Sequence, residues 1–224
     1  MNPERHVLVV FPHPDDEAFG VSGTISMHIA NDTHVTYACL TLGEMGRNLG
    51  NPPFATRESL PGIRKKELKK AADAMGIKDL RMMGLRDKTI EFEDDEKMVR
   101  LMTGLLDELK PSLVISFYPG YSVHPDHEAT GRAVVRAIER LPKNAQPKLH
   151  CVAFSKGHQE KIGLPDIVHN VEPYSSQKIA AIKAHISQTA WLLEDMEEKW
   201  LNKDEEALKW LNFERFWTYP LQSS

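Results

Sequence analysis

Two short segments of the chain place histidines beside carboxylates at spacings that suit a metal site. The first, His-Pro-Asp-Asp-Glu, covers residues 13–17, and the second, His-Pro-Asp-His, covers residues 124–127. A catalytic zinc site takes three protein ligands from His, Asp or Glu and leaves one position for water. The residue types therefore predict one metal centre divided between two distant segments.

The spacing within the two segments suggests which residues bind the ion. His13 and Asp16, three apart across a turn, supply two ligands, and His127 supplies the third. Neighbouring residues point in different directions, so Asp15 lies beside the metal and is placed to take a proton from water. We expect Zn²⁺, although two histidines with one carboxylate also suit ferrous iron, Fe²⁺.

The second segment leaves two residues for a different task. His124 is available to donate a hydrogen bond or a positive charge to the oxyanion that forms when an amide carbonyl is attacked. Asp126 is close by in sequence, and we expect it to hold the His124 imidazole in the required state. The predicted chemistry is therefore metal-assisted hydrolysis of an amide.

Helix starts offer a plainer explanation for part of each motif. Pro14 and Pro125 suit the first position of a helix, and the acidic residues interact favourably with its positive end. This explanation suffices for Glu17, to which we assign no chemistry. It leaves the three histidines of the two motifs unexplained.

An alternation of strands and helices positions both motifs. Apolar runs predict strands over residues 6–11, 35–42, 80–85, 113–118 and 149–154. Amphipathic stretches predict helices over residues 17–31, 63–75, 95–109, 125–140, 175–188 and 189–211. The chain is expected to form a single α/β domain over residues 1–224. Its fold class is Rossmann-like and doubly wound, with a mostly parallel sheet and helices on both faces.

Each motif follows the C-terminal end of a predicted strand and opens the next helix. In the common doubly wound orders, the first and fourth strands in sequence are neighbours on either side of the topological switch point. Ligands bind there, outside the carboxyl ends of the strands. The two motifs are therefore expected to meet in one crevice.

Two further regions carry expectations of their own. Residues 43–62 lack clear periodicity and follow the end of a strand, so we expect a lid or rim of the active site. The C-terminal part of the chain holds all four tryptophans, which we expect to pack a terminal layer on the sheet rather than form a subunit interface.

Composition excludes several classes of protein. With 28 basic and 32 acidic residues, the net charge is -4, which gives no broad attraction to nucleic acid or anionic lipid. No apolar stretch approaches the roughly 18 residues of a membrane span, and no signal peptide is evident. We expect a cytoplasmic protein with neither nucleic-acid nor membrane partners. Cys39 and Cys151 lie in apolar runs and are expected to be buried free thiols.

As a pair, the motifs resemble those of the LmbE/PIG-L family of zinc-dependent deacetylases. Weaker agreement covers most of the chain and includes residues 43–46, Arg64, Glu67, Arg86, Asp87, Lys183, His185, Ser187 and Gln188. The resemblance implies zinc bound by His13, Asp16 and His127. It also implies Asp15 as general base, with His124 stabilising the oxyanion and Asp126 orienting it. These roles agree with those assigned from the residues alone.

The resemblance also implies a substrate. Arg64 and Asp87 match family positions that contact the sugar of an N-acetylglucosaminyl substrate, although a solvated place on a basic helix is the alternative for Arg64. The chain looks most similar to deacetylases of bacillithiol biosynthesis, which act on N-acetylglucosamine joined to malate, and relatives of this type often form homo-oligomers. A tyrosine that assists the oxyanion in mycothiol-type relatives is replaced by Ser122, with Tyr121 one residue earlier. No role is derived for His185.

Two other functions compete with the deacetylase. One is an amidase that cleaves a larger acyl group from a glucosaminyl thiol conjugate, which a long rigid pocket would favour. The other is a non-catalytic module that binds a metal or a nucleotide. No Gly-x-Gly-x-x-Gly or Walker motif follows the first strand, and a structural zinc site would need neither Asp15 nor His124.

Overall fold

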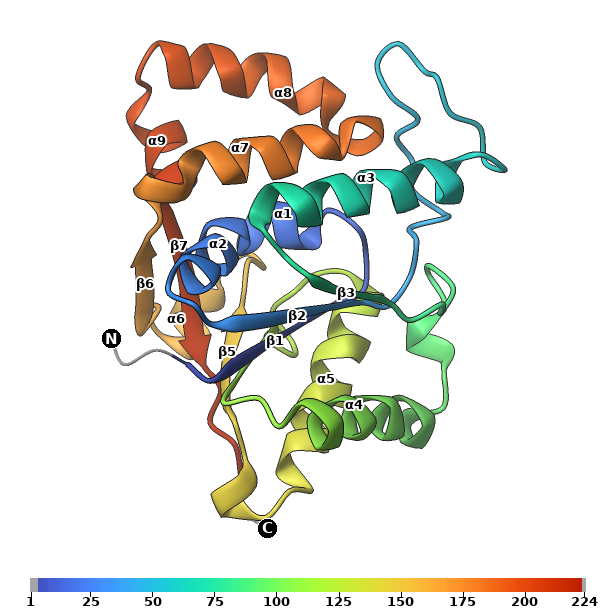
Figure 1. Cartoon of the computed structure of the whole chain (residues 1–224), viewed down its shortest axis with the longest axis vertical. Coiled ribbons are helices and arrows are strands. Elements are labelled where there is room, and N and C mark those ends of the chain that lie inside the picture. Colours follow the sequence, from blue (N-terminus) through green and yellow to red (C-terminus); the bar gives the residue numbers. More distant parts are fainter. Residues whose placement is uncertain (1–3, 223–224) are drawn as a thin grey trace.

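One seven-stranded sheet runs through residues 4–222, the part of the chain that the computed structural model describes (Figure 1). The strands are β1 His6–Phe11, β2 His34–Cys39, β3 Asp79–Met82, β4 Leu113–Phe117, β5 Lys148–Val152, β6 Ile167–Asn170 and β7 Phe213–Thr218. Their order is β3-β2-β1-β4-β5-β7-β6. The first five pair in parallel, whereas β7 runs antiparallel to both β5 and β6. The predicted doubly wound, mostly parallel sheet is confirmed.

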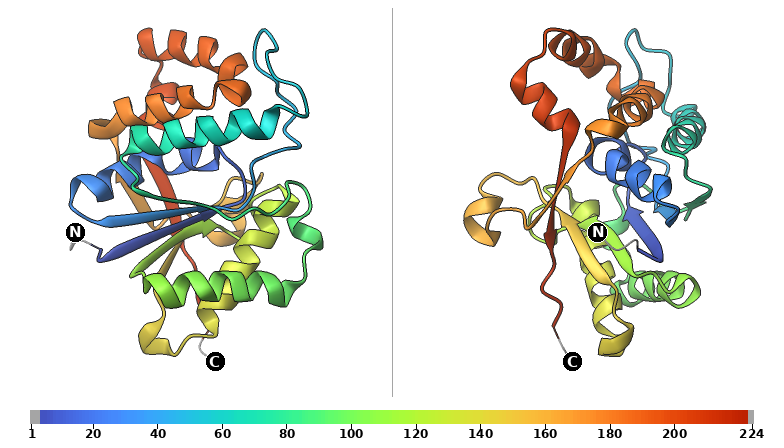
Figure 2. Two further views of the ribbon diagram at one scale, coloured as in Figure 1. Left: turned by 45° about the vertical axis from the view of Figure 1, so that its right-hand side comes forward. Right: turned by 60° about the vertical axis from the view of Figure 1, so that its left-hand side comes forward.

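Helices cover both faces of this sheet (Figure 2). The α-helices are α1 Asp16–Gly20, α2 Ser22–Ala30, α3 Leu60–Met75, α4 Asp95–Leu109, α5 Pro125–Glu139, α6 His158–Ile162, α7 Ser175–Ala184, α8 Ile186–Leu201 and α9 Glu205–Asn212. Short 3₁₀ helices are η1 Ile90–Phe92, η2 Lys143–Ala145 and η3 Glu172–Tyr174. One layer contains α1, α2, α3 and α7, with α8 and α9 outside it, and the other contains α4 and α5 (Figure 1).

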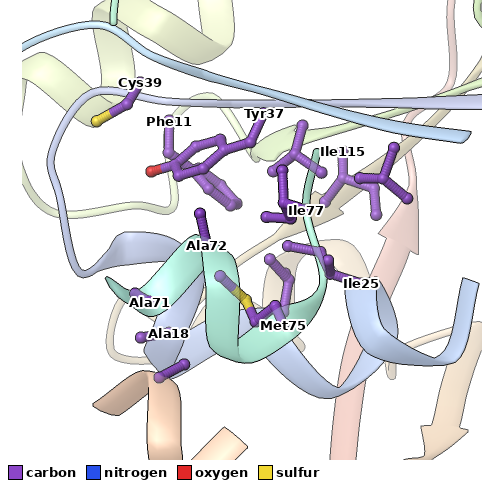
Figure 3. Close-up of a cluster of buried hydrophobic side chains, with 14 of the residues drawn as sticks. Phe11, Ala18, Ile25, Tyr37, Cys39, Ala71, Ala72, Met75, Ile77 and Ile115 are labelled. Carbon is purple, nitrogen blue, oxygen red and sulfur yellow. The ribbon is translucent and has the colours of Figure 1, made fainter. Parts of the chain in front are cut away.

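The core explains why β1 has an unbroken apolar sequence. Phe11 and Tyr37 point toward the layer of α2 and α3, where they meet Ile25 and Met75 (Figure 3). Leu8 points to the opposite face and joins the cluster formed with α4 and α5. Residues 7–11 of β1 are therefore buried on one face or the other, and burial of each large apolar side chain stabilises the fold by about 1.5–3 kcal/mol.

The differences from the predicted elements lie mainly near the C-terminus. The predicted helices over 175–188 and 189–211 are three helices, and β6 and β7 were not predicted as strands. The amphipathic stretch over 17–31 is also divided, because Val21 leaves the helical conformation between α1 and α2. β6 is short and only partly buried, so its sequence carries little of the apolar signal that marks the central strands.

The tryptophans and cysteines follow the expectations with one exception. Trp217 is buried on β7, and Trp210 stacks on Trp200 with ring centroids 6.4 Å apart. Trp191 instead is 62% exposed, so its expected packing role is wrong. Both cysteines are free and buried, as predicted. No helix within residues 4–222 has the length and apolar character needed to cross a membrane.

Candidate metal centre

The two motifs lie together at the switch point of the sheet. β1 and β4 are parallel neighbours, so the segments that follow their carboxyl ends emerge side by side. The first motif leads from β1 into α1, and the second opens α5. His13 Nδ1 lies 3.2 Å from His127 Nε2. The prediction that two distant segments meet in one crevice is confirmed.

Donor atoms of three residues, His13, Asp16 and His127, converge at this point. Besides the contact between the two imidazoles, Asp16 Oδ2 lies 3.5 Å from His13 Nδ1. Its Oδ1 lies 3.3 Å from His127 Nε2. Ligands at tetrahedral positions around one zinc ion, each bound at about 2.0–2.1 Å, are separated by about 3.3 Å. The spacing of these three donors therefore fits a single ion.

Hydrogen bonds fix which nitrogen of each ring carries a proton. His127 Nδ1 lies 3.1 Å from the carbonyl oxygen of Ser122, which only accepts, so His127 Nε2 keeps its lone pair. His13 Nε2 faces Asp126 Oδ2 at 3.2 Å and Asp87 Oδ1 at 3.1 Å, so it donates, and His13 Nδ1 keeps its lone pair. When both rings are neutral, two lone pairs thus face each other.

A cation between the donors would stabilise this arrangement. Two nitrogen lone pairs and a carboxylate at this separation repel one another unless positive charge lies among them. Without a metal ion, the same surroundings favour a proton on His13: burial opposes a charge on the ring, but hydrogen bonds to Asp126, Asp16 and Asp87 raise its pKa well above the usual value. The donor set fits Zn²⁺ held by His13, Asp16 and His127.

Two other groups of donor atoms come within 4.8 Å of one another, and both include His13. In the first, His124 joins the two histidines already described, but its Nδ1 accepts a backbone N–H. In the second, Asp87 and Asp126 approach the opposite nitrogen of His13, where they accept a hydrogen bond. Carboxylates in that position orient a metal-binding histidine rather than replace it.

Asp15 lies beside the donor set in a strained conformation. Its φ of 107° is in the left-handed region, which non-glycine residues rarely adopt and which is often found at functional sites. Asp15 Oδ2 is 3.0 Å from Arg64 Nη2. Burial raises the pKa of Asp15 to about 6, although the charge of Arg64 acts in the opposite direction. A carboxylate of this pKa is suited to accept and return a proton near neutral pH.

Arg64 is part of the centre rather than of a solvated helix face. Only 3% of the residue is exposed, so the alternative reading of Arg64 is wrong. Its guanidinium donates to the carbonyl oxygens of Gly43, at 3.0 Å, and of Pro14, besides contacting Asp15. Arg64 therefore connects the first motif to the loop that follows β2.

His124 caps the first turn of α5, and this cap determines its tautomer. The backbone N–H of Asp126 donates to His124 Nδ1 at 3.1 Å, so the ring proton resides on Nε2. Burial and the charges of the neighbouring histidines lower the pKa of His124, which favours the neutral ring at neutral pH. His124 is thus prepared to donate a hydrogen bond rather than a positive charge.

Asp126 orients His124 only through this backbone group. Its carboxylate binds elsewhere: Oδ2 contacts His13 and accepts from the Lys88 N–H at 2.8 Å, and Oδ1 accepts from Ile90 N–H at 3.1 Å. The expectation that Asp126 holds His124 therefore needs correction. The fully buried Asp126 side chain acts on His13, which donates to it together with the N–H groups of Lys88 and Ile90.

A cavity of about 450 Å³ opens onto the donor set. It is lined by His13, Asp15, Asp16, Met45, Gly46, Arg47, Arg64, Asp87, Lys88, His124 and His127. Arg64 and Asp87 thus reach the cavity, but each already contacts a residue of the centre. Their expected contact with a sugar stays a prediction. Tyr121 packs edge-on against Tyr118, outside this lining.

A buried network behind the first motif was not predicted from the sequence. Glu17 is 0% exposed, and its Oε1 lies 2.6 Å from His185 Nε2. Its Oε2 accepts from the Tyr37 hydroxyl at 2.9 Å and from the Asp15 N–H at 3.1 Å. The helix-end explanation of Glu17 is therefore wrong, because the residue supports the strained turn at Asp15. The only signal was the resemblance that marked His185.

Two further sets of contacts attach α3 and the loop between β2 and α3 to the start of α8. Glu67 accepts from the Ser187 N–H at 2.8 Å and from its hydroxyl at 2.7 Å. Next to it, Gln188 Nε2 donates to the Asn48 carbonyl at 2.9 Å, and Asn48 Nδ2 donates back to the Gln188 carbonyl at 3.2 Å. The loop is thereby attached to the start of α8, and its residues Met45, Gly46 and Arg47 form a rim of the cavity.

The doubly wound fold and the donor set at its switch point are those expected of a metal-dependent hydrolase. The PIG-L family model, described as GlcNAc-PI de-N-acetylase, matches residues 8–138. The chain belongs to the PIG-L family, and the resemblance to LmbE/PIG-L deacetylases is confirmed. It is an enzyme that hydrolyses an amide bond, so the non-catalytic module is excluded.

Two relatives and one solved structure illustrate the similarity. "Probable N-acetyl-alpha-D-glucosaminyl L-malate deacetylase 2" of Bacillus anthracis is 52% identical over 222 residues, 99% of this chain and 98% of the relative. The relative of the same name in Bacillus subtilis (strain 168) is 49% identical over 216 residues, which cover 96% of this chain and 98% of the relative. N,N'-diacetylchitobiose deacetylase from Pyrococcus horikoshii superimposes with a TM-score of 0.73 at 24% identity, covering 98% of this chain and 86% of that chain. The last likeness confirms the fold.

Proposed function

We propose that this chain is a zinc-dependent deacetylase acting on N-acetyl-α-D-glucosaminyl L-malate in bacillithiol biosynthesis. The products are acetate and the free amine of glucosaminyl malate. The observation that carries the proposal is the convergence of donor atoms of His13, Asp16 and His127 in a cavity that Asp15 and His124 also line. The substrate is supported by relatives of that name, whose sequences match almost the whole chain.

Zinc would be held by His13, Asp16 and His127, where it supplies a Lewis acid that polarises the amide carbonyl and lowers the pKa of water. The protein's own groups then manage protons and charge. Asp15 Oδ accepts the proton of the attacking water, while Arg64 holds the carboxylate in place. Amide hydrolysis needs both a base and an acid, and Asp15 fills both roles. After accepting the proton of water, it donates that proton to the leaving amine nitrogen.

His124 stabilises the charge that develops on the carbonyl oxygen. Because its Nδ1 is occupied by the α5 cap, its Nε2–H is available to the oxyanion. Asp126 and Asp87 act one step further back, where their carboxylates fix the ring of His13. Arg64 and Asp87 are proposed to touch the sugar from the cavity wall.

The amidase alternative receives less support. Charged and hydrogen-bonding groups dominate the cavity lining, whereas a larger acyl group needs an apolar wall. The expectations of a homo-oligomer and of a cytoplasmic location stay predictions.

The test is to incubate the purified protein with N-acetylglucosaminyl malate, a neutral N-acetylglucosaminide and a glucosaminyl thiol conjugate with a larger acyl group. Free amine is measured, and an Asp15→Asn preparation controls for contaminating hydrolases. We expect the malate compound to be the best substrate. Amine release from the thiol conjugate alone would favour the amidase, and no release from any compound would overturn the proposal. Metal analysis of protein purified without air distinguishes zinc from ferrous iron.

A further inference from the structure

Two cationic side chains line the cavity without a protein partner. Arg47 lies in the loop between β2 and α3, and Lys88 follows β3; both residues are exposed. Among residues 4–222, neither side chain forms a hydrogen bond or an ion pair, so both charges face solvent and the cavity. We call Arg47 and Lys88 the rim cations.

The other charged groups of the cavity are already paired. Arg64 contacts Asp15 at 3.0 Å, and Asp87 contacts His13 at 3.1 Å. These pairs lie in the buried part of the site, where they position the reacting groups. Since the whole protein carries a net charge of -4, the unpaired positive charge at this cavity is local rather than a consequence of composition. The rim cations therefore remain available to a ligand.

The backbone beneath the rim cations is fixed. The Lys88 N–H donates to Asp126 Oδ2 at 2.8 Å, within the network that supports the metal centre. Gly46 and Asn48, the neighbours of Arg47, are each held by hydrogen bonds from side chains elsewhere in the chain. Two charged side chains thus project from anchored segments, which suits recognition better than chains on mobile loops.

We propose that the rim cations form a subsite for carboxylate groups on the aglycone of the substrate. This subsite rests on the proposed deacetylation, and it would determine which N-acetylglucosaminides the enzyme prefers. While the acetamide occupies the metal centre, the group attached to the sugar extends to the cavity mouth. L-Malate carries two carboxylates, which match two cations, and the Arg47 guanidinium offers a planar fork suited to one of them.

The experiment compares two substrates that differ only in the aglycone: N-acetyl-α-D-glucosaminyl malate and the neutral methyl N-acetyl-α-D-glucosaminide. We expect the ratio of their kcat/KM values, malate over methyl, to fall about tenfold or more in Arg47→Gln and Lys88→Gln. Arg86→Gln is the matched control, because Arg86 is exposed and lies two residues from Lys88 but outside the cavity lining. Its ratio should equal that of the wild type.

Two further measurements distinguish an effect on substrate binding at the subsite from an effect on catalysis. Added salt should raise KM for the malate compound in the wild type, because it screens exposed charges. Calorimetric binding of the product glucosaminyl malate should weaken in the same two variants, which needs no turnover. A ratio and a product affinity that do not change in either variant would overturn the subsite. If the wild type deacetylated neither substrate, the proposed function would be contradicted. Binding of glucosaminyl malate to the wild type and the two variants would still test the rim cations.

Discussion

The buried network behind the metal centre and the charged rim of its cavity are built differently. Glu17, Glu67, His185 and Ser187, which we call the floor, lie behind the residues that line the cavity, and each binds at least one other member or the first motif. The rim cations are exposed and have no partner within residues 4–222. Partnered groups fix geometry in advance, whereas unpartnered charges remain free to bind a ligand. We therefore expect changes in the floor to affect stability and turnover, and changes at the rim to affect selection of the substrate.

The largest expected effect distinguishes the two roles proposed for the first motif, which are proton transfer and metal binding. Asp15→Asn should retain the metal and lower kcat by about 10²–10⁴-fold, because the proton acceptor is lost. His13→Ala should lose the metal itself, because one of three converging donors is removed. Metal content by mass spectrometry and kcat are measured together.

Asp32→Asn is the control, since Asp32 is also an aspartate with positive φ, at 57°, but is exposed. It should keep both metal and turnover. An Asp15→Asn protein with full activity would show that the base lies elsewhere.

The next effect tests the floor directly. Glu17→Ala should lower the free energy of unfolding by about 3–5 kcal/mol, because removing one partner of a buried ion pair leaves the other uncompensated. Denaturant unfolding measures this change. Glu160→Ala is matched to it, since Glu160 also lies in the first turn of a five-residue helix, α6, but is exposed. Equal and small effects of the two substitutions would restore the helix-end explanation of Glu17.

A smaller effect concerns the group that stabilises the oxyanion. His124→Ala should lower kcat by about 10²–10³-fold, equivalent to about 2.7–4 kcal/mol, with the metal retained. His34→Ala should leave kcat unchanged, because His34 is exposed and begins β2, whereas the metal centre follows the carboxyl ends of the strands. Metal loss in the His124 variant would assign this residue to the donor set with His13 and His127.

The sequence predicted what depends on local pattern. β1 and α4 were predicted with the observed bounds, because one is a continuous apolar run and the other has a strong apolar face. His13 and His127 were recognisable as donors because helix capping does not account for them, whereas His124 does cap the start of α5. The floor was not predictable: Glu17 meets His185 across 168 positions, and only the packing of the C-terminal helices brings them together. The contact of the Asp126 carboxylate with His13, rather than with the adjacent His124, also depends on tertiary structure.

The last prediction contrasts a buried histidine that has a carboxylate partner with one that has none. Glu17 helps to raise the pKa of His185 despite its burial. His28 in α2 is also buried, but its Nε2 has no hydrogen-bond partner within the described residues, and its nearest ring is His169, 6.4 Å away. Burial and the charge of His169 lower the pKa of His28 to about 4, with His150 acting in the same direction and Glu4 against it.

An unfolded chain with the ordinary pKa of 6.5 binds more protons at His28 than the folded chain between pH 6.5 and about 4. Stability should therefore be complete above pH 6.5 and decrease as the pH falls, by about 2 kcal/mol at pH 5. Urea unfolding of the wild type and of His28→Gln at pH 7.5 and pH 5 measures this, and the variant should lose less stability on acidification. Identical losses would show that His28 is protonated in the folded protein, and that burial without a carboxylate partner does not suppress its charge.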